Sequence, residues 1–107
     1  MVSVLEKMRK LEEYIAADSA AVDPVLELTL DKLLAREITR ATARKKTLTA
    51  QIAKFEQQYH LSSEDFLAQF QAGTLGDDID FIEWAATLEM LKNLNDRLTL
   101  LENNLEK

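Results

Sequence analysis

The sequence predicts an all-α fold: an elongated antiparallel helical hairpin or bundle with coiled-coil-like seams. The 107 residues include only one proline and two glycines, too few for the turns of a multi-stranded sheet. Apolar residues recur at helical spacing along most of the chain. Both glycines and five of the seven aromatic residues lie at 59–84, between two long helical patterns, which suits one connecting elbow. The length suits one small domain, so we expect a single helical domain over 1–107.

The first helix is expected at about 2–18. Its apolar residues alternate by three and four, which places them on one helical face; they are Met1, Val4, Met8, Leu11 and Ile15. The chain then turns, and Asp23 followed by Pro24 predicts the start of the next helix. A carboxylate there can accept hydrogen bonds from free amides, and proline suits the first helical position.

The second helix is expected at about 24–59. The apolar run at 25–30 alternates as a strand would, but no partner strand is evident, so we assign it to the helix. Two series with a seven-residue period indicate a coiled-coil-like seam: Leu34, Ala41, Leu48 and Phe55, and Ile38, Lys45, Ile52 and Tyr59. A helix of this length spans about 54 Å, whereas the last predicted helix spans about 42 Å. Apolar residues left uncovered, such as Leu26, Leu30 and Leu33, need the first helix or another chain, which predicts a homodimer.

A short helical elbow is expected at about 62–73, with its helix at 63–72. Ser62 and Asp65 have the spacing of a capping box, and Gly73 suits a left-handed helix end. The last helix is expected at about 79–106, where a seven-residue repeat places these residues on one face: Trp84, Leu91, Leu98 and Leu105.

Charge and composition exclude several classes of function. A net charge of −6 argues against a nucleic-acid or anionic-membrane surface, because phosphate binding needs clustered cations. The chain has no cysteine, no signal peptide and no apolar stretch of transmembrane length, so a cytoplasmic protein is expected. Residues 23–60 carry a net charge of +2 and residues 61–107 a net charge of −7. The basic stretch Arg36, Arg40 and Arg44 is expected to face solvent or the acidic last helix, and an acidic protein partner remains an alternative.

Catalytic and metal-binding patterns are weak, and we expect neither an enzyme nor a cofactor. Glu56 and the only histidine, His60, lie one turn apart, but a histidine at a helix end is more often structural. An acidic cluster precedes and opens the last helix, where carboxylates stabilise free amides without a metal ion; it comprises Asp77, Asp78, Asp80 and Glu83. Whether this cluster binds an ion is left open by the sequence.

The aromatic residues of the elbow are the candidate partner-binding residues. This aromatic corner consists of Tyr59, Phe66, Phe70, Phe81 and Trp84. Such a set most often forms a local core that holds a hairpin turn together. Aromatic side chains also dominate the energetics of protein interfaces, so an exposed edge of the corner would suit a protein partner.

The elbow resembles a family of small helical bacterial and archaeal proteins, antitoxins of the TumA type, which are encoded beside a TumE-type toxin. The likeness covers about residues 30–101 and is specific for the elbow, where it rests on Ser62, Phe66, Phe70, Gly73, Gly76, Asp77, Asp78, Phe81, Glu83 and Trp84. Gln71 and Ile82 depart from the pattern, which has a charged and an aromatic residue there.

The resemblance implies a protein that binds and neutralises a cognate toxin protein without chemistry of its own. An acidic antitoxin would complement a toxin with a basic, RNA-facing active site. The alternative is a structural or adaptor coiled-coil protein that self-associates. A DNA-binding autorepressor is a third hypothesis, although the sequence shows no helix-turn-helix or ribbon arm.

Overall fold

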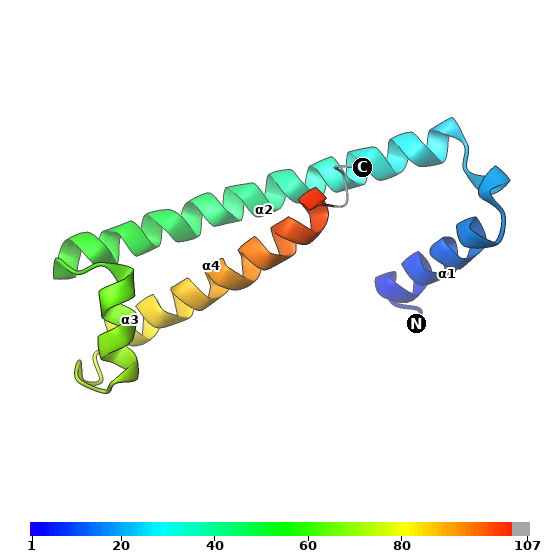
Figure 1. The fold of residues 1–107 in the computed structure, drawn as a ribbon. Helices are drawn as coiled ribbons and strands as arrows, with labels where there is room; N and C mark the ends of the chain where they lie inside the picture. The colour runs from blue at the N-terminus through cyan, green and yellow to red at the C-terminus, as the bar shows by residue number, and fades with distance from the viewer. Residues whose placement is uncertain (104–107) are drawn as a thin grey trace. The chain divides into compact units, whose positions relative to one another are not determined.

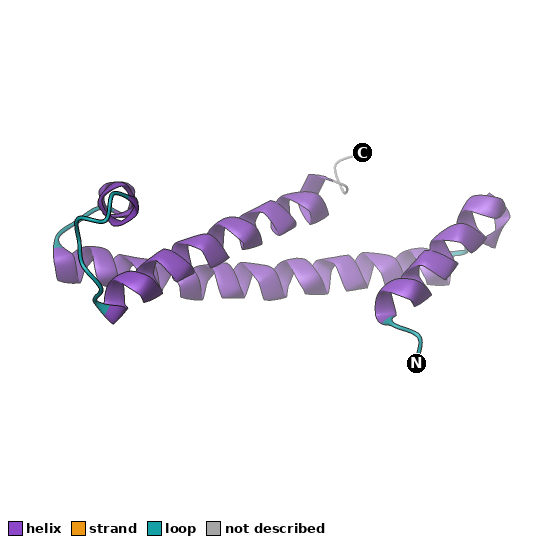
Figure 2. Cartoon of the chain, turned by 90° about the horizontal axis from the view of Figure 1, so that it is seen from below, coloured by secondary structure: helices purple, strands orange, loops and turns teal. Residues whose placement is uncertain are grey.

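The computed structural model describes residues 1–103 and confirms the all-α prediction. Its elements are α1 (Val4–Ala17), a short 3₁₀ helix η1 (Ser19–Ala21), α2 (Pro24–Tyr59), α3 (Ser63–Gln71) and α4 (Ile79–Asn103) (Figures 1 and 2). Residues 1–103 contain no strand. The run at 25–30 is helical, as expected. The predicted continuation of the last helix over 104–106, which includes Leu105 of the predicted repeat, lies outside the described residues.

The chain divides into two compact units, Met1–Ala35 and Arg36–Lys107, and the boundary falls within α2. The first contains α1, η1 and the opening turns of α2. The second contains the rest of α2 together with α3 and α4. The expectation of a single domain over 1–107 stays a prediction.

The first unit is held by local capping. Ser3 Oγ accepts a hydrogen bond from the backbone N–H of Glu6, and Asp18 Oδ1 accepts one from Ala20. α2 starts as predicted, because Asp23 Oδ1 accepts from the N–H of Leu26 at 2.8 Å and Pro24 is the first helical residue. No residue of α1 is buried, so its apolar face stays uncovered in the described chain. The expected return of this helix along α2 therefore stays a prediction.

The second unit is an antiparallel helical hairpin. Side chains in the last turns of α2 contact side chains in the first turns of α4, where Phe55 lies beside Trp84 and Tyr59 beside Phe81. The core consists of Leu48, Ile52, Phe66, Trp84, Leu94 and Leu98. Leu48 and Ile52 come from the two predicted series on α2, and Trp84 and Leu98 from the repeat on α4. The seven-residue pattern therefore identified the contact faces of both long helices.

One buried polar residue lies within this hairpin. Thr87 is 5% exposed, and its hydroxyl donates to the backbone carbonyl of Glu83 at 2.7 Å. A buried hydroxyl satisfied within its own helix needs no partner from the other helix.

None of the helices in residues 1–103 is both long and apolar enough to cross a membrane.

Two helices end in the same hydrogen-bonding pattern with different residues at the left-handed position. In α3, Gly73 has φ 76°, and Thr74 N–H donates to the carbonyl of Gln69. In α2, His60 has φ 51°, and Leu61 N–H donates to the carbonyl of Glu56. Both are Schellman-type ends, in which the left-handed residue reverses the chain. Glycine adopts this conformation freely, whereas the Cβ of His60 makes it unfavourable.

Replacing His60 by glycine should raise the free energy of unfolding by about 0.5–1 kcal/mol, because the left-handed strain is relieved and only part of the gain is lost to the greater entropy of the unfolded chain. His60→Ala keeps the Cβ and should give no such gain. Urea denaturation followed by circular dichroism measures both variants. If both variants gained the same stability, the left-handed φ of residue 60 would not be the cause of the gain.

Phe66→Ala should lower the free energy of unfolding by about 3–5 kcal/mol, because the side chain is fully buried and its removal leaves a cavity. Tyr14→Ala is the control, since Tyr14 is 66% exposed and its loss should change stability by no more than about 0.5 kcal/mol. The same denaturation experiment compares them. Similar losses in the two variants would contradict the assignment of the core to the second unit.

Candidate functional site

The aromatic corner is organised around the indole ring of Trp84. The ring of Phe66 lies parallel to it at a centroid distance of 3.9 Å and an interplanar angle of 4°. Phe55 stacks at 5.6 Å and 12°, and Tyr59 at 6.1 Å and 24°. Trp84 and Phe66 are completely buried. Aromatic pairs of this kind contribute about 0.5–1.5 kcal/mol each beyond the area they bury, so the stack fixes α3 against both long helices.

The other rings lie at the margin of this stack. Phe81 contacts Tyr59 at 5.1 Å and Phe66 at 6.0 Å, and Phe70 contacts Phe66 at 5.4 Å. All three marginal residues, Tyr59, Phe70 and Phe81, are half-buried. Of the five candidate partner-binding residues, these three keep surface that a partner can reach. Contact with a partner at this corner stays a prediction.

Hydrogen bonds join α3 to both neighbouring helices. Trp84 Nε1 donates to Ser63 Oγ at 3.1 Å, which satisfies the buried indole N–H. Glu56 Oε2 accepts from the backbone N–H of Ser63 at 2.9 Å, and Ser62 Oγ accepts from Asp65 N–H at 3.1 Å. The serine half of the expected capping box is therefore present, and the next free amide of α3, that of Ser63, is capped by a carboxylate from α2. Glu56 thus caps α3, a role that sequence spacing did not reveal because its partner lies in another helix.

Tyr59 and Asp80 form the second link between α2 and α4. The Tyr59 hydroxyl donates to Asp80 Oδ2 at 2.5 Å, and Gln58 Nε2 donates to the same oxygen at 3.4 Å. The hydrogen bond to Asp80, with partial desolvation and the negative charges of Asp80 and Asp78, raises the pKa of Tyr59 to about 12. The carboxylate stabilises the protonated phenol, because ionisation would remove the donor and add a like charge.

The acidic cluster at the start of α4 has a structural part. Asp78 Oδ1 accepts from the N–H of Asp80 at 2.9 Å, and the carbonyl of Asp78 accepts from Phe81 and Ile82. Asp78 therefore caps α4, and Asp80 binds Tyr59. Among residues 1–103, no three His, Cys, Asp or Glu side chains are grouped so that they could hold a metal ion.

A surface with acidic and apolar residues surrounds this corner. Residues 61–91 contain seven acidic residues and no lysine or arginine. Ile79 and Ile82 on the first turn of α4 are 68% and 55% exposed. Phe70 also lines a hollow of about 340 Å³ between α3 and α4, together with Leu67 and Leu88. The corner therefore offers exposed apolar side chains and a hollow in a segment rich in acidic residues, with Lys54 and Lys92 at its edges.

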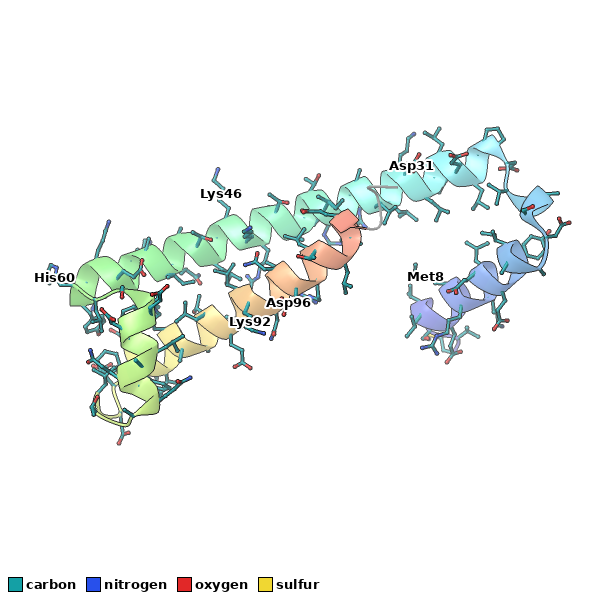
Figure 3. The ribbon with its side chains drawn as sticks, in the orientation of Figure 1. Met8, Asp31, Lys46, His60, Lys92 and Asp96 are labelled. Carbon is teal, nitrogen blue, oxygen red and sulfur yellow. The ribbon has the colours of Figure 1, made fainter. Side chains whose placement is uncertain are left out.

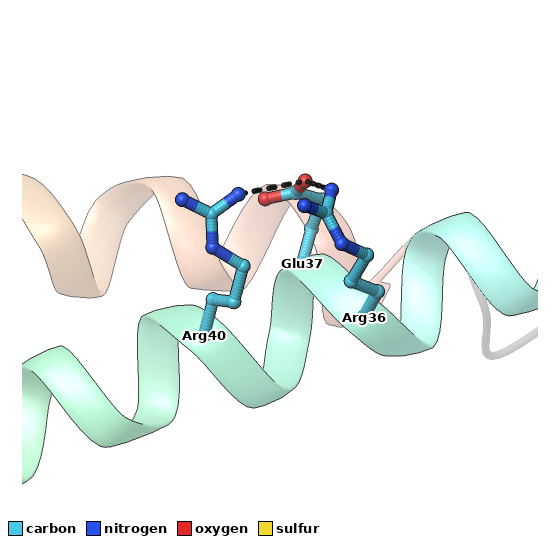
Figure 4. A network of polar contacts seen from close by, with 3 residues as sticks. All are labelled: Arg36, Glu37 and Arg40. Atoms are coloured by element: carbon cyan, nitrogen blue, oxygen red, sulfur yellow. Dashed lines mark hydrogen bonds and ion pairs between the residues drawn. The ribbon is translucent and has the colours of Figure 1, made fainter.

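The basic stretch of α2 does not face acidic residues of α4. Glu37 Oε1 binds Arg36 Nη1 at 3.1 Å and Arg40 Nη1 at 3.6 Å, all on the exposed side of one helix (Figure 4). The other ion pair in residues 1–103, Lys92–Asp96, is also local to one helix. Arg44 lines a groove whose opposite wall carries Arg97. The expectation of solvent is therefore met for all three arginines, which are exposed, and Arg40 and Arg44 also line the groove that carries Arg97.

Comparison with known proteins adds no relative: no family model, curated protein or solved structure matches this chain.

The hydrogen bond between Tyr59 and Asp80 predicts a change in stability at alkaline pH. Because the pKa of Tyr59 is raised above its usual value of 10, the stabilisation is complete below pH 10 and is lost as the pH rises towards 12. Chemical denaturation at pH 9–12 should show this loss, and Tyr59→Phe should show a smaller one over the same range. If the free energy of unfolding of Tyr59→Phe fell with pH as steeply as that of the native chain, the loss could not be assigned to this hydrogen bond.

Proposed function

We propose that this protein is a non-enzymatic, antitoxin-like protein that acts as a homodimer in the cytoplasm, where it binds and neutralises a cognate toxin protein. The observation that carries the proposal is the acidic and apolar surface at the aromatic corner. Ile79 and Ile82 are exposed there, and no basic side chain lies between residues 61 and 91. The acidic residues would attract a basic protein partner, and the exposed apolar side chains would be buried in the contact with it. The resemblance of the elbow sequence to TumA-type antitoxins supports the same partner class.

The buried stack makes this surface suitable for recognition. Trp84 and Phe66 hold the ends of α2, α3 and α4 together, so the marginal rings are presented by a fixed frame. A preformed surface loses less conformational entropy on binding than a flexible one. In this proposal the half-buried edges of Tyr59, Phe70 and Phe81 contact the toxin, and Trp84 and Phe66 position them from below.

The second candidate function is a structural or adaptor protein that self-associates. It is favoured by the uncovered apolar residues of the first unit, since Val4, Leu5 and Met8 are all more than half exposed. Exposed apolar side chains on one helix commonly mark an interaction surface. This function predicts a stable oligomer and no toxic neighbouring gene, whereas the antitoxin proposal predicts both an oligomer and a toxic neighbour.

Co-expression with the neighbouring reading frame tests the proposal. The native chain should rescue growth and co-purify with the toxin. Ile82→Arg should weaken the complex at least 10-fold, because it replaces an exposed apolar contact by a positive charge facing a basic partner.

Gln57→Arg is the matched control for that measurement, since it adds the same charge at an exposed position of α2. Isothermal titration calorimetry should give it the affinity of the native chain. A neighbouring product that is harmless, or that does not bind, would eliminate the antitoxin proposal and leave the adaptor.

A further inference from the structure

A groove runs between α2 and α4 of the second unit, on a part of the hairpin remote from the aromatic corner. It encloses about 700 Å³, and its apolar lining includes Leu98, Leu100 and Leu101. A second hollow of about 320 Å³ shares Arg44, Leu94 and Arg97 with it and extends the groove towards Met90. Two packed helices with an apolar groove between them can accept a further helix.

The groove is basic although the molecule is acidic. Arg40, Arg44 and Arg97 line it, and its only acidic residue, Glu37, already binds Arg36 and Arg40. Within residues 1–103, Arg44 and Arg97 take part in no ion pair. Like charges across a groove repel one another, so an occupant with carboxylates beside apolar residues would be favoured.

The opening turns of α2 have the complementary chemistry. Residues 24–35 carry Leu26, Leu30 and Leu33 at helical spacing, with Glu27 and Asp31 one turn apart and Lys32 as the only basic residue. Leu33 is 47% exposed and Leu26 and Leu30 are half-buried, so this segment needs further cover. It belongs to the same unbroken helix that forms one wall of the groove, and a helix cannot fill a groove of which it is a wall. The same segment of a second copy has no such restriction.

We propose that two copies of this chain dock reciprocally, with residues 24–35 of each copy in the α2–α4 groove of the other. Each copy has one groove and one acidic, leucine-rich segment, so a two-fold symmetric dimer forms the same segment–groove contact twice. The segment is about 18 Å long. α1 is the weaker candidate for the groove because its three acidic and three basic residues cancel. This inference rests on the homodimer of the proposed function and specifies its contact surface.

A charge exchange tests the contact in the full chain. One variant carries Arg44→Glu and Arg97→Glu, and the other carries Glu27→Arg and Asp31→Arg. The native chain should be a dimer in sedimentation equilibrium, and the dissociation constant of each variant alone should be at least 10-fold higher. In the first variant an acidic segment faces an acidic groove, and in the second a basic segment faces a basic groove, so like charges repel in both.

Mixing the two variants should restore the dimer as a heterodimer, since both of its contacts pair opposite charges. Misfolded variants would not recover on mixing, so the readout separates binding from stability. The control is Lys10→Glu with Lys46→Glu, which changes the charge as much as the first variant. Lys46 is exposed and points away from α4 (Figure 3), and this control should dimerise like the native chain.

The outcomes distinguish this inference from the proposed function. A native monomer would overturn both this contact and the proposed homodimer, and would leave the groove to an acidic helix of another protein. A dimer indifferent to the charge exchange but lost in Met8→Glu would place the contact on α1 and overturn only this inference. Toxin binding is measured separately and does not affect either result.

Discussion

Trp84 is the residue on which the second unit depends, because it connects three helices by two kinds of contact. Its ring stacks on Phe66 of α3 and on Phe55 and Tyr59 of α2. Its indole N–H donates to Ser63 at the start of α3. The same serine donates its backbone N–H to Glu56 of α2. Removing the indole would therefore separate α3 from α4 and weaken the turn that sets α2 and α4 antiparallel.

Charge is distributed so that different regions of the molecule suit different partners. The corner around α3 is rich in acidic residues, whereas the groove between α2 and α4 is lined by three arginines. The described ion pairs are all within single helices, so they contribute little to holding the hairpin closed. Packing, rather than ion pairing, holds α2 against α4. In our proposals, a basic protein binds at the corner and an acidic helix binds in the groove.

Much of the fold could be predicted because helical periodicity and capping are local signals. Asp23 and Pro24 start α2, and Gly73 follows α3, as their backbone preferences require. His60 carried a weaker signal, because histidine adopts the left-handed conformation more often than most residues with a Cβ but far less readily than glycine. The candidate site was less predictable. The burial of Trp84 and Phe66, against the exposure of Ile79 and Ile82, depends on how three helices meet.

The helices, their apolar faces and the composition of the elbow could be predicted, because they follow from the spacing of residues along one chain. The packing of the helices determined which aromatic residues are buried and which keep an exposed edge. It also decided that Glu56 caps a helix other than its own and that Arg44 and Arg97 face the same groove. Each of these facts joins residues from different helices. Such contacts depend on the angle and register of packed helices, which no local pattern specifies.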